Sequence, residues 1–178
     1  MADQIVSPVG KVLWSDLTQT DAYGKYTLKV GFGPDVDLSV IEEQIALAVD
    51  EKFGGKVTPK MRMPIVDGNT EVDDDGKVYE TSKDMRIVRF KTKRKPQCVG
   101  PKGPEDIIDA EDIYSGCYVK VMCEFFPYDN VGKGVSAQLD AVQLYKHGPA
   151  LTGGSGKKIP LKDAFAEVPE SDDDDPWK

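Results

Sequence analysis

Histidine and paired cysteines are scarce in this sequence. Its 178 residues contain one histidine, His147, and three cysteines without any Cys-x-x-Cys spacing. This pattern argues against a disulfide framework and against a zinc site. Because no serine or cysteine motif lies near His147, catalysis by a histidine-activated nucleophile is also disfavoured. We expect no cofactor, and we expect Cys117 and Cys123, which share one face of an alternating segment, to be small core residues.

Long apolar runs are absent as well. No stretch approaches the roughly 18 apolar residues of a membrane span. The first residues, Met1-Ala2-Asp3-Gln4, lack the basic and apolar regions of a signal peptide. No phosphate-binding loop of the Gly-x-x-x-x-Gly-Lys-Ser/Thr type is present, and the glycine-rich segment 153–158 is typical of a linker. We therefore expect a cytoplasmic protein that has no membrane contact and does not use this segment to hold a nucleotide.

Charge is abundant but unevenly distributed. The net charge is -8, which on average disfavours contact with phosphates. Residues 83–102, however, contain eight cations and one acid, a local charge of +7, whereas residues 163–178 contain seven acids and one cation, a local charge of -6. Clustering of cations matters more for phosphate binding than the total charge does. The sequence thus predicts one basic stripe on a nearly neutral domain.

The acidic end of the chain combines a run of carboxylates with one indole. Adjacent aspartates repel one another and cannot be buried unpaired, so this end must lie in water. A solubilising role would explain the acids, but a lone exposed tryptophan is typical of an anchor for a partner's pocket. We assign residues 1–150 to a folded domain and 151–178 to a flexible linker with a disordered acidic tail. The predicted partner-binding residues of the tail are Asp172, Asp173, Asp174, Asp175 and Trp177.

Hydrophobic periodicity predicts a mainly β fold with one helix. Period-two alternation indicates strands over 11–17, 24–32, 85–94, 116–128 and 135–146. A helix is expected from the capping box Ser39-Val40-Ile41-Glu42 to Gly54-Gly55. Residues 56–82 are rich in Pro, Gly and Asp and predict a β-excursion, with hairpin-type turns at Asp67-Gly68 and Asp75-Gly76. A small, mostly antiparallel barrel fits this pattern, as do an SH3-like barrel and a sandwich.

The strand over 85–94 carries cations on both faces, which a half-buried strand cannot hide. Binding of a single nucleic-acid strand requires cations that follow the backbone and aromatic rings that stack on unpaired bases. Trp14 and Tyr79 are further aromatic candidates, although we expect Trp14 to pack in the core. The predicted phosphate-binding residues are Arg86, Arg89, Lys91, Lys93, Arg94 and Lys95. The predicted base-stacking residues are Phe90, Tyr118, Phe126 and Tyr128.

Several of these segments also resemble a known family. The similarity extends from Lys11 to about Gly154 and is densest over 113–143. The segments that carry it are Ile113-Tyr114-Ser115-Gly116-Cys117-Tyr118-Val119, Tyr128-Asp129-Asn130, Gly134-Val135-Ser136-Ala137 with Leu139, Ala141, Val142 and Gln143, and Pro64-Ile65-Val66-Asp67-Gly68 ahead of Tyr79. They resemble a phage and prophage family, once a domain of unknown function and now regarded as single-stranded-DNA-binding proteins. The resemblance implies a five-stranded OB-fold barrel and a role in coating single strands during phage replication, recombination or repair.

The sequence therefore favours a largely sequence-independent single-stranded-DNA-binding protein that is not an enzyme. Its acidic tail is expected to compete for the DNA-binding groove and to recruit replication or recombination proteins, and self-association into a homo-oligomer is left open. One alternative is a Mg²⁺-dependent nuclease that uses the carboxylates between Asp67 and Asp75. Another is an acidic protein-interaction module or DNA mimic, which predicts no oligonucleotide binding at all.

Overall fold

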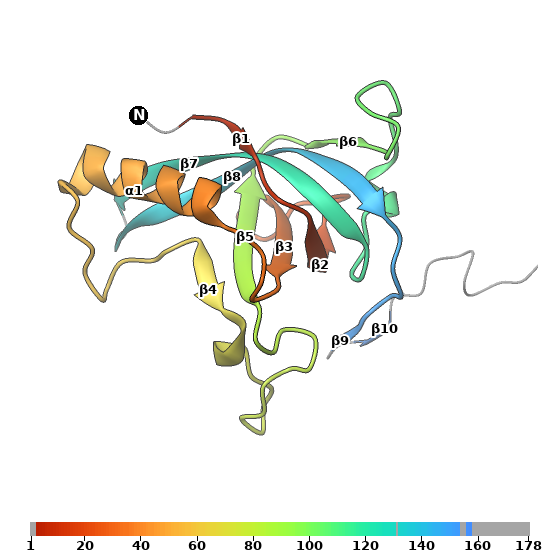
Figure 1. Ribbon diagram of the computed structural model, residues 1–178, viewed down its shortest axis with the longest axis horizontal. Helices are drawn as coiled ribbons and strands as arrows, with labels where there is room; N and C mark the ends of the chain where they lie inside the picture. Colours follow the sequence, from red (N-terminus) through yellow and green to blue (C-terminus); the bar gives the residue numbers. More distant parts are fainter. Residues whose placement is uncertain (1–2, 131, 154–155, 158–178) are drawn as a thin grey trace, which may run out of the picture.

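A five-stranded barrel forms the centre of this computed structural model, which describes residues 3–130, 132–153 and 156–157 (Figure 1). In chain order the barrel strands are β2 (Gly10–Asp16), β3 (Tyr26–Phe32), β5 (Arg86–Thr92), β7 (Tyr118–Asn130) and β8 (Gly132–Lys146). Hydrogen bonding follows the order β2-β3-β5-β8-β7, and β7 pairs with β2 again, which closes the barrel. Strands β5 and β8 are parallel, whereas the other neighbouring pairs are antiparallel. This arrangement confirms the predicted OB-type barrel.

Shorter elements surround the barrel. Strand β1 (Ile5–Val6) extends the sheet beside β7, β4 (Ile65–Asp67) pairs with β5, and β6 (Gln97–Val99) pairs with β8. The remaining elements are the 3₁₀ turns η1 (Gly68–Thr70) and η2 (Ala110–Asp112), and the paired strands β9 (Thr152–Gly153) and β10 (Gly156–Lys157). The β9–β10 pairing lies within the segment predicted to be a linker. No helix within the described residues is long and apolar enough to span a membrane.

Helix α1 (Ser39–Phe53) packs against β7 and β8 where their hairpin extends beyond the barrel (Figure 1). Its buried side chains include Ile41, Ile45 and Val49. Gly54 ends the helix in the left-handed conformation, at φ 60°, as the sequence predicts. The predicted capping role of Ser39 is wrong, because the residue before the helix is Leu38 and the local hydrogen bond runs from the Ser39 amide to the Asp37 carboxylate at 2.9 Å.

Alternating side chains of the barrel strands fill its core. Strand β5 contributes Val88 and Phe90, and β7 contributes Val119, Val121, Cys123 and Phe125. The prediction that Cys117 and Cys123 are core residues is confirmed, since both are fully buried. Burial raises the pKa of the Cys117 thiol to about 11 and that of the Cys123 thiol to about 12, so both thiols stay protonated at neutral pH.

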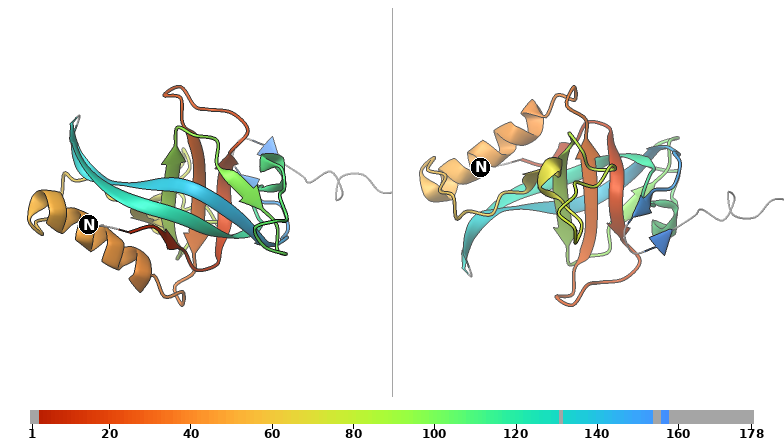
Figure 2. Two further views of the ribbon diagram at one scale, coloured as in Figure 1. Left: turned by 90° about the horizontal axis from the view of Figure 1, so that it is seen from above. Right: turned by 90° about the horizontal axis from the view of Figure 1, so that it is seen from below.

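The predicted β-excursion between α1 and β5 lies over the outer surface of β5 and β3 (Figure 2, view from below). We call residues 56–84 the insertion. It contains β4 and η1, followed by a small hairpin in which Val72 pairs with Val78. The turn at Asp75-Gly76 is confirmed, with Gly76 at φ 80°. The hairpin turn predicted at Asp67-Gly68 is wrong, because the chain enters η1 there instead.

Candidate nucleic-acid interface

One aromatic ring and two cations lie in a row across the outer surface of β2, β3 and β5. In the strand register, Lys29 of β3 lies opposite both Trp14 of β2 and Arg89 of β5. Two positions along the strands, the neighbouring row of outward-facing residues consists of Asp16, Thr27 and Lys91. We call these two rows the β2–β3–β5 face. In OB-folds, the surface of the second and third barrel strands, here β3 and β5, is the usual platform for oligonucleotides.

Trp14 is the only aromatic ring in these two rows, and it is 44% exposed. The expectation that it packs in the core is therefore wrong. The cause is a β-bulge: Val12 pairs with Val30, but Trp14 pairs with the next residue back, Lys29, so one extra residue is accommodated in β2. A one-residue shift moves the following side chains to the other face of the sheet. The bulge thus brings the indole beside two cations.

One carboxylate, that of Glu71, reaches this face from outside the strands. Glu71 of the insertion accepts a hydrogen bond from the guanidinium of Arg89, and its Oε1 lies 3.7 Å from Nζ of Lys29. Burial tends to raise the pKa of Glu71, but the bond from Arg89 and the charge of Lys29 outweigh it, and the pKa lies below its ordinary value. Glu71 is therefore ionised at neutral pH and partly neutralises the two cations.

Lys91 lies at the end of the face near the loop between β2 and β3. It is exposed, and its charge acts on Asp21 of that loop. The backbone amide of Lys25 is the main cause of the lowered pKa of Asp21, and the amide of Tyr23 and the charge of Lys91 act in the same direction. Lys91 is thus exposed to a ligand at this end of the face, and Asp21 is its acidic neighbour.

Three of the predicted phosphate-binding residues follow β5 rather than lying on it. Lys93, Arg94 and Lys95 are all exposed in the turn between β5 and β6. The amide of Arg94 donates to the Thr92 hydroxyl at 3.1 Å, and the charge of Arg94 acts on Glu124 of β7. This turn therefore continues the basic stripe from β5 toward the β7–β8 side of the barrel.

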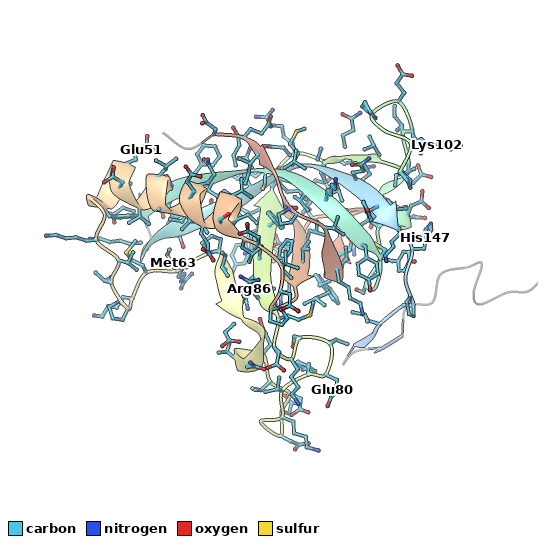
Figure 3. The ribbon with its side chains drawn as sticks, in the orientation of Figure 1. Glu51, Met63, Glu80, Arg86, Lys102 and His147 are labelled. Atoms are coloured by element: carbon cyan, nitrogen blue, oxygen red, sulfur yellow. The ribbon has the colours of Figure 1, made fainter. Side chains whose placement is uncertain are left out.

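Two predicted binding residues have structural positions instead. The ring of Phe90 is 0% exposed and belongs to the barrel core, so it offers no face to a base. Arg86 donates from its guanidinium to the carbonyl oxygens of Gly33, at 2.9 Å, and of Val36, and thereby holds the segment between β3 and α1 (Figure 3). Both residues point to the same side of β5 as Val88, which the alternation correctly indicated. The predicted stacking of a base on Phe90 is therefore wrong, whereas the phosphate contact of the half-buried Arg86 stays a prediction.

The other predicted stacking residues lie on β7, on the opposite side of the barrel (Figure 2). Phe126 is 43% exposed, whereas Tyr118 and Tyr128 are half-buried. Lys146 lies over the Tyr118 ring at 4.8 Å, and on the neighbouring positions Lys120 lies over the Tyr145 ring at 5.6 Å. Strand β8 separates these positions from the cations of β5, since Lys91 pairs with Gln138 of β8 and Gln138 pairs with Glu124 of β7. Only Tyr118 approaches the β2–β3–β5 face, through its pairing with Lys11 of β2.

The outer surface of β7 and β8, which we call the β7–β8 face, also carries a pair of neighbouring acids. Burial and the carboxylate of Asp140 both raise the pKa of Glu124, and Arg94 opposes them. Asp140 accepts hydrogen bonds from the side-chain amides of Gln4, at 2.9 Å, and Gln138, at 3.1 Å. In contrast to Glu71, which lies between two cations, Glu124 has another acid as its close neighbour.

The carboxylates of Asp67 and Asp73 take part in local turns. Asp67 accepts from the amide of Asn69, and Asp73 accepts from the amides of Asp75 and Lys77, each at 2.9 Å. Within the described parts of the chain, no three His, Cys, Asp or Glu side chains gather in a way that could hold a metal ion. The predicted tail residues, Asp172–Asp175 and Trp177, lie outside the described residues.

Sequence reasoning missed two residues of this face, Lys29 and Glu71, and named Trp14 only as a further candidate that was expected to pack in the core. Lys29 could have been found, because it alternates with the apolar Leu28 and Val30 and must face outward. The outward position of Trp14 could not have been predicted, since nothing in the local sequence marks the bulge in β2. Glu71 reaches the face from an insertion, whose path over the barrel depends on tertiary packing.

The closed five-stranded barrel has the strand order of an OB-fold, and on its outer surface the indole of the first barrel strand lies beside cations of the second and third. Comparison with known proteins agrees. Residues 12–175 match the family model described as Enterobacter phage Enc34, ssDNA-binding protein. The chain belongs to this family.

Individual relatives extend the comparison. Protein p50 of Acyrthosiphon pisum secondary endosymbiont phage 1 is 31% identical over 162 residues, which cover 87% of this chain and 88% of that protein. The single-stranded DNA-binding protein from bacteriophage Enc34 has a similar structure, with a TM-score of 0.71 and 21% identity over 92% of this chain and 90% of that chain. The Enc34 protein in complex with ssDNA matches with a TM-score of 0.66 and 22% identity over 80% and 86% of the two chains.

Proposed function

We propose that this protein binds single-stranded DNA on the β2–β3–β5 face without strong sequence preference. The observation that carries the proposal is the row formed by Trp14, Lys29 and Arg89. The exposed indole offers a flat apolar surface to one base, and the cations of the next two strands can contact phosphates. Membership in a family described by single-stranded-DNA binding supports this assignment.

The strand would be held mainly by its backbone and by stacking. Lys91 at the rim and Lys93, Arg94 and Lys95 beyond it would continue the phosphate contacts of Lys29 and Arg89. These groups recognise features that every nucleotide shares, so binding would be largely independent of sequence. The residues assigned here bind and orient a strand; none of them is required to make or break a bond.

The biological role that fits these properties is coating of single strands in the cytoplasm of a phage-infected bacterium during replication, recombination or repair. Similarity to phage proteins over most of the chain supports this setting. The acidic tail would recruit replication or recombination proteins through Trp177 and would compete with DNA through Asp172–Asp175. The charge of the tail is opposite to that of the basic stripe, which supports competition between them.

Fluorescence anisotropy with matched single-stranded and duplex oligonucleotides across a salt series tests the function. If three to five phosphates are contacted, log K for the single strand should fall with log salt with a slope of about -2 to -3.5. Single-strand binding should exceed duplex binding at each salt concentration. Absence of binding to either ligand would favour the protein-interaction module, and cleavage of labelled DNA in Mg²⁺ or Mn²⁺ would favour the nuclease.

Truncation after Pro169 tests the tail separately. Removal of the acids should raise DNA affinity at low salt, and the gain should shrink at high salt because the attraction is screened. Trp177→Ala should leave DNA affinity unchanged and reduce capture of purified replication proteins. Unaltered DNA affinity of the truncated protein at every salt concentration would show that the tail does not compete for the face.

A further inference from the structure

We propose that Glu71 acts as an internal counter-ion of the DNA-binding face and that a single strand must displace its carboxylate in order to bind. The inference rests on the proposed function and deepens it. It assigns a role in setting affinity and salt dependence to a residue of the insertion, which is neither a predicted phosphate contact nor a base-stacking residue.

The geometry places the Glu71 carboxylate where a phosphate would be bound. A single oxygen, Oε1, lies against both the guanidinium of Arg89 and the ammonium of Lys29. These are the two cations of the row that contains Trp14. Because a phosphate and a carboxylate are both anionic oxygen acceptors, they compete for the same donors. A strand that stacks on Trp14 and contacts both cations therefore has to replace Glu71.

The insertion holds Glu71 in this position through its backbone. The Gly68 amide donates to the Met85 carbonyl at 2.7 Å, and residues 65–67 pair with β5. A side chain at position 68 would meet the Ser82 carbonyl oxygen at 1.9 Å, so the backbone at Gly68 and the backbone at Ser82 approach each other closely. The Glu71 amide donates to Gly68 and its carbonyl accepts from Tyr79. Displacement can thus proceed by rotation of the Glu71 side chain while the backbone stays in place.

Partial exposure of the three groups makes this exchange accessible. The side chains of Arg89, Lys29 and Glu71 are 46%, 35% and 24% exposed. Ion pairs with this degree of exposure are weak because solvent screens them. The pair therefore holds the cations in the free protein but can yield to a polyanion that makes several contacts at once.

Displacement has a measurable consequence in the salt dependence of binding. Phosphates that contact cations release the counter-ions condensed on the DNA. A displaced Glu71 carboxylate takes up a cation from solution and so offsets part of this release. Its removal should make the slope of log K against log salt steeper, so the gain in affinity over wild type should grow as the salt is diluted.

The test compares the wild-type protein with Glu71→Gln by anisotropy of a fluorescein-labelled oligothymidylate across a salt series. The matched control is Glu80→Gln, which makes the same change in charge at an exposed position of the insertion (Figure 3). We expect Glu71→Gln to bind several-fold more tightly than wild type at low salt with a steeper slope, and Glu80→Gln to change both quantities less. Thermal unfolding confirms that each variant is folded.

A double-mutant cycle identifies the cations involved. If Glu71 acts through Arg89, the affinity gain of Glu71→Gln should shrink in an Arg89→Ala background. Unchanged affinity and slope in Glu71→Gln overturn the inference, and so does weaker binding, which would mean that Glu71 positions Arg89 for DNA. A gain equalled by Glu80→Gln also overturns it, since the effect would then reflect net charge. If the wild-type protein does not bind the oligothymidylate, the proposed function itself fails.

Discussion

The β2–β3–β5 face and the β7–β8 face contain the same kinds of side chain in different arrangements. On the first, the indole of Trp14 lies beside two cations, and the carboxylate of Glu71 lies between those cations. On the second, lysines lie over the rings of Tyr118 and Tyr145, and the acid Glu124 has the acid Asp140 as its neighbour. The two faces lie on opposite sides of the barrel (Figure 2).

This difference shows that composition alone does not identify a binding surface. Cations that already lie over aromatic rings, as Lys146 does over Tyr118, cover one face of a ring that a base would use. Cations paired with a displaceable acid, as Arg89 is with Glu71, stay at the surface and can exchange that acid for a phosphate. We therefore assign DNA to the β2–β3–β5 face, and the following variants test that choice.

The largest expected effect separates the barrel core from the outer surface of the barrel. Phe90→Ala removes a fully buried ring, and we expect the free energy of unfolding to fall by about 3–5 kcal/mol. The exposed ring of Phe126 is the matched case, and Phe126→Ala should cost less than about 1 kcal/mol. Urea unfolding measures the free energy of unfolding of both variants. Affinity per folded molecule should be unchanged in Phe90→Ala; a stable variant with lost DNA binding would contradict the assignment of this ring to the core.

The next effect compares aromatic rings across the two faces. Trp14→Ala should weaken single-strand binding by about 1–3 kcal/mol, or roughly fivefold to 100-fold. We expect the smaller loss from Phe126→Ala. Anisotropy at fixed salt measures the two affinities, and thermal unfolding serves as the control for folding. A loss in Phe126→Ala that equals or exceeds that in Trp14→Ala would move the binding site to the β7–β8 face.

A third comparison uses cations. Lys91→Ala should reduce the magnitude of the salt slope by about 0.7, the value for one phosphate contact on a single strand. Lys120→Ala, on the β7–β8 face, makes the same change in charge and should leave the slope nearly unchanged. Equal changes in the two slopes would show that binding responds to overall charge rather than to contacts on one face.

The smallest effect concerns how the free energy of unfolding depends on pH. Its expected sign at Glu71, on the β2–β3–β5 face, is opposite to that at Glu124, on the β7–β8 face. The pKa of Glu71 is lowered in the folded state, so its ionised form stabilises the protein above the ordinary pKa of 4.5, and this contribution is lost as the pH falls through the folded value. The pKa of Glu124 is raised, so its contribution is present below the ordinary value and is lost as the pH rises through the folded value.

Glu71→Gln should therefore lower the thermal midpoint at neutral pH, and Glu124→Gln should raise it. The difference for Glu71→Gln should vanish as the pH falls below the lowered folded pKa of Glu71, and that for Glu124→Gln should vanish below the ordinary carboxyl pKa. Thermal unfolding across a pH series measures them. A lowered midpoint in Glu124→Gln at neutral pH would contradict the unfavourable interaction between Glu124 and Asp140.

Local pattern was sufficient for most of the fold. The alternation around Leu28 and Val88 predicts strands because neighbouring side chains point to opposite faces, and the helical spacing that ends at Gly54 predicts α1. The same alternation separates Phe90 from Arg89. The sequence resemblance added the barrel type, which periodicity alone left open between several β architectures.

Tertiary structure decided which side chains form the proposed binding surface. The bulge in β2 places Trp14 outside, barrel closure places the rings of β7 away from the cations of β5, and the insertion brings Glu71 onto Lys29 and Arg89. Each of these depends on contacts between residues far apart in the chain. The sequence by itself determined which segments become strands and where cations occur, because those properties are local. Which side chains meet depends on strand register and barrel closure, and local pattern does not specify either.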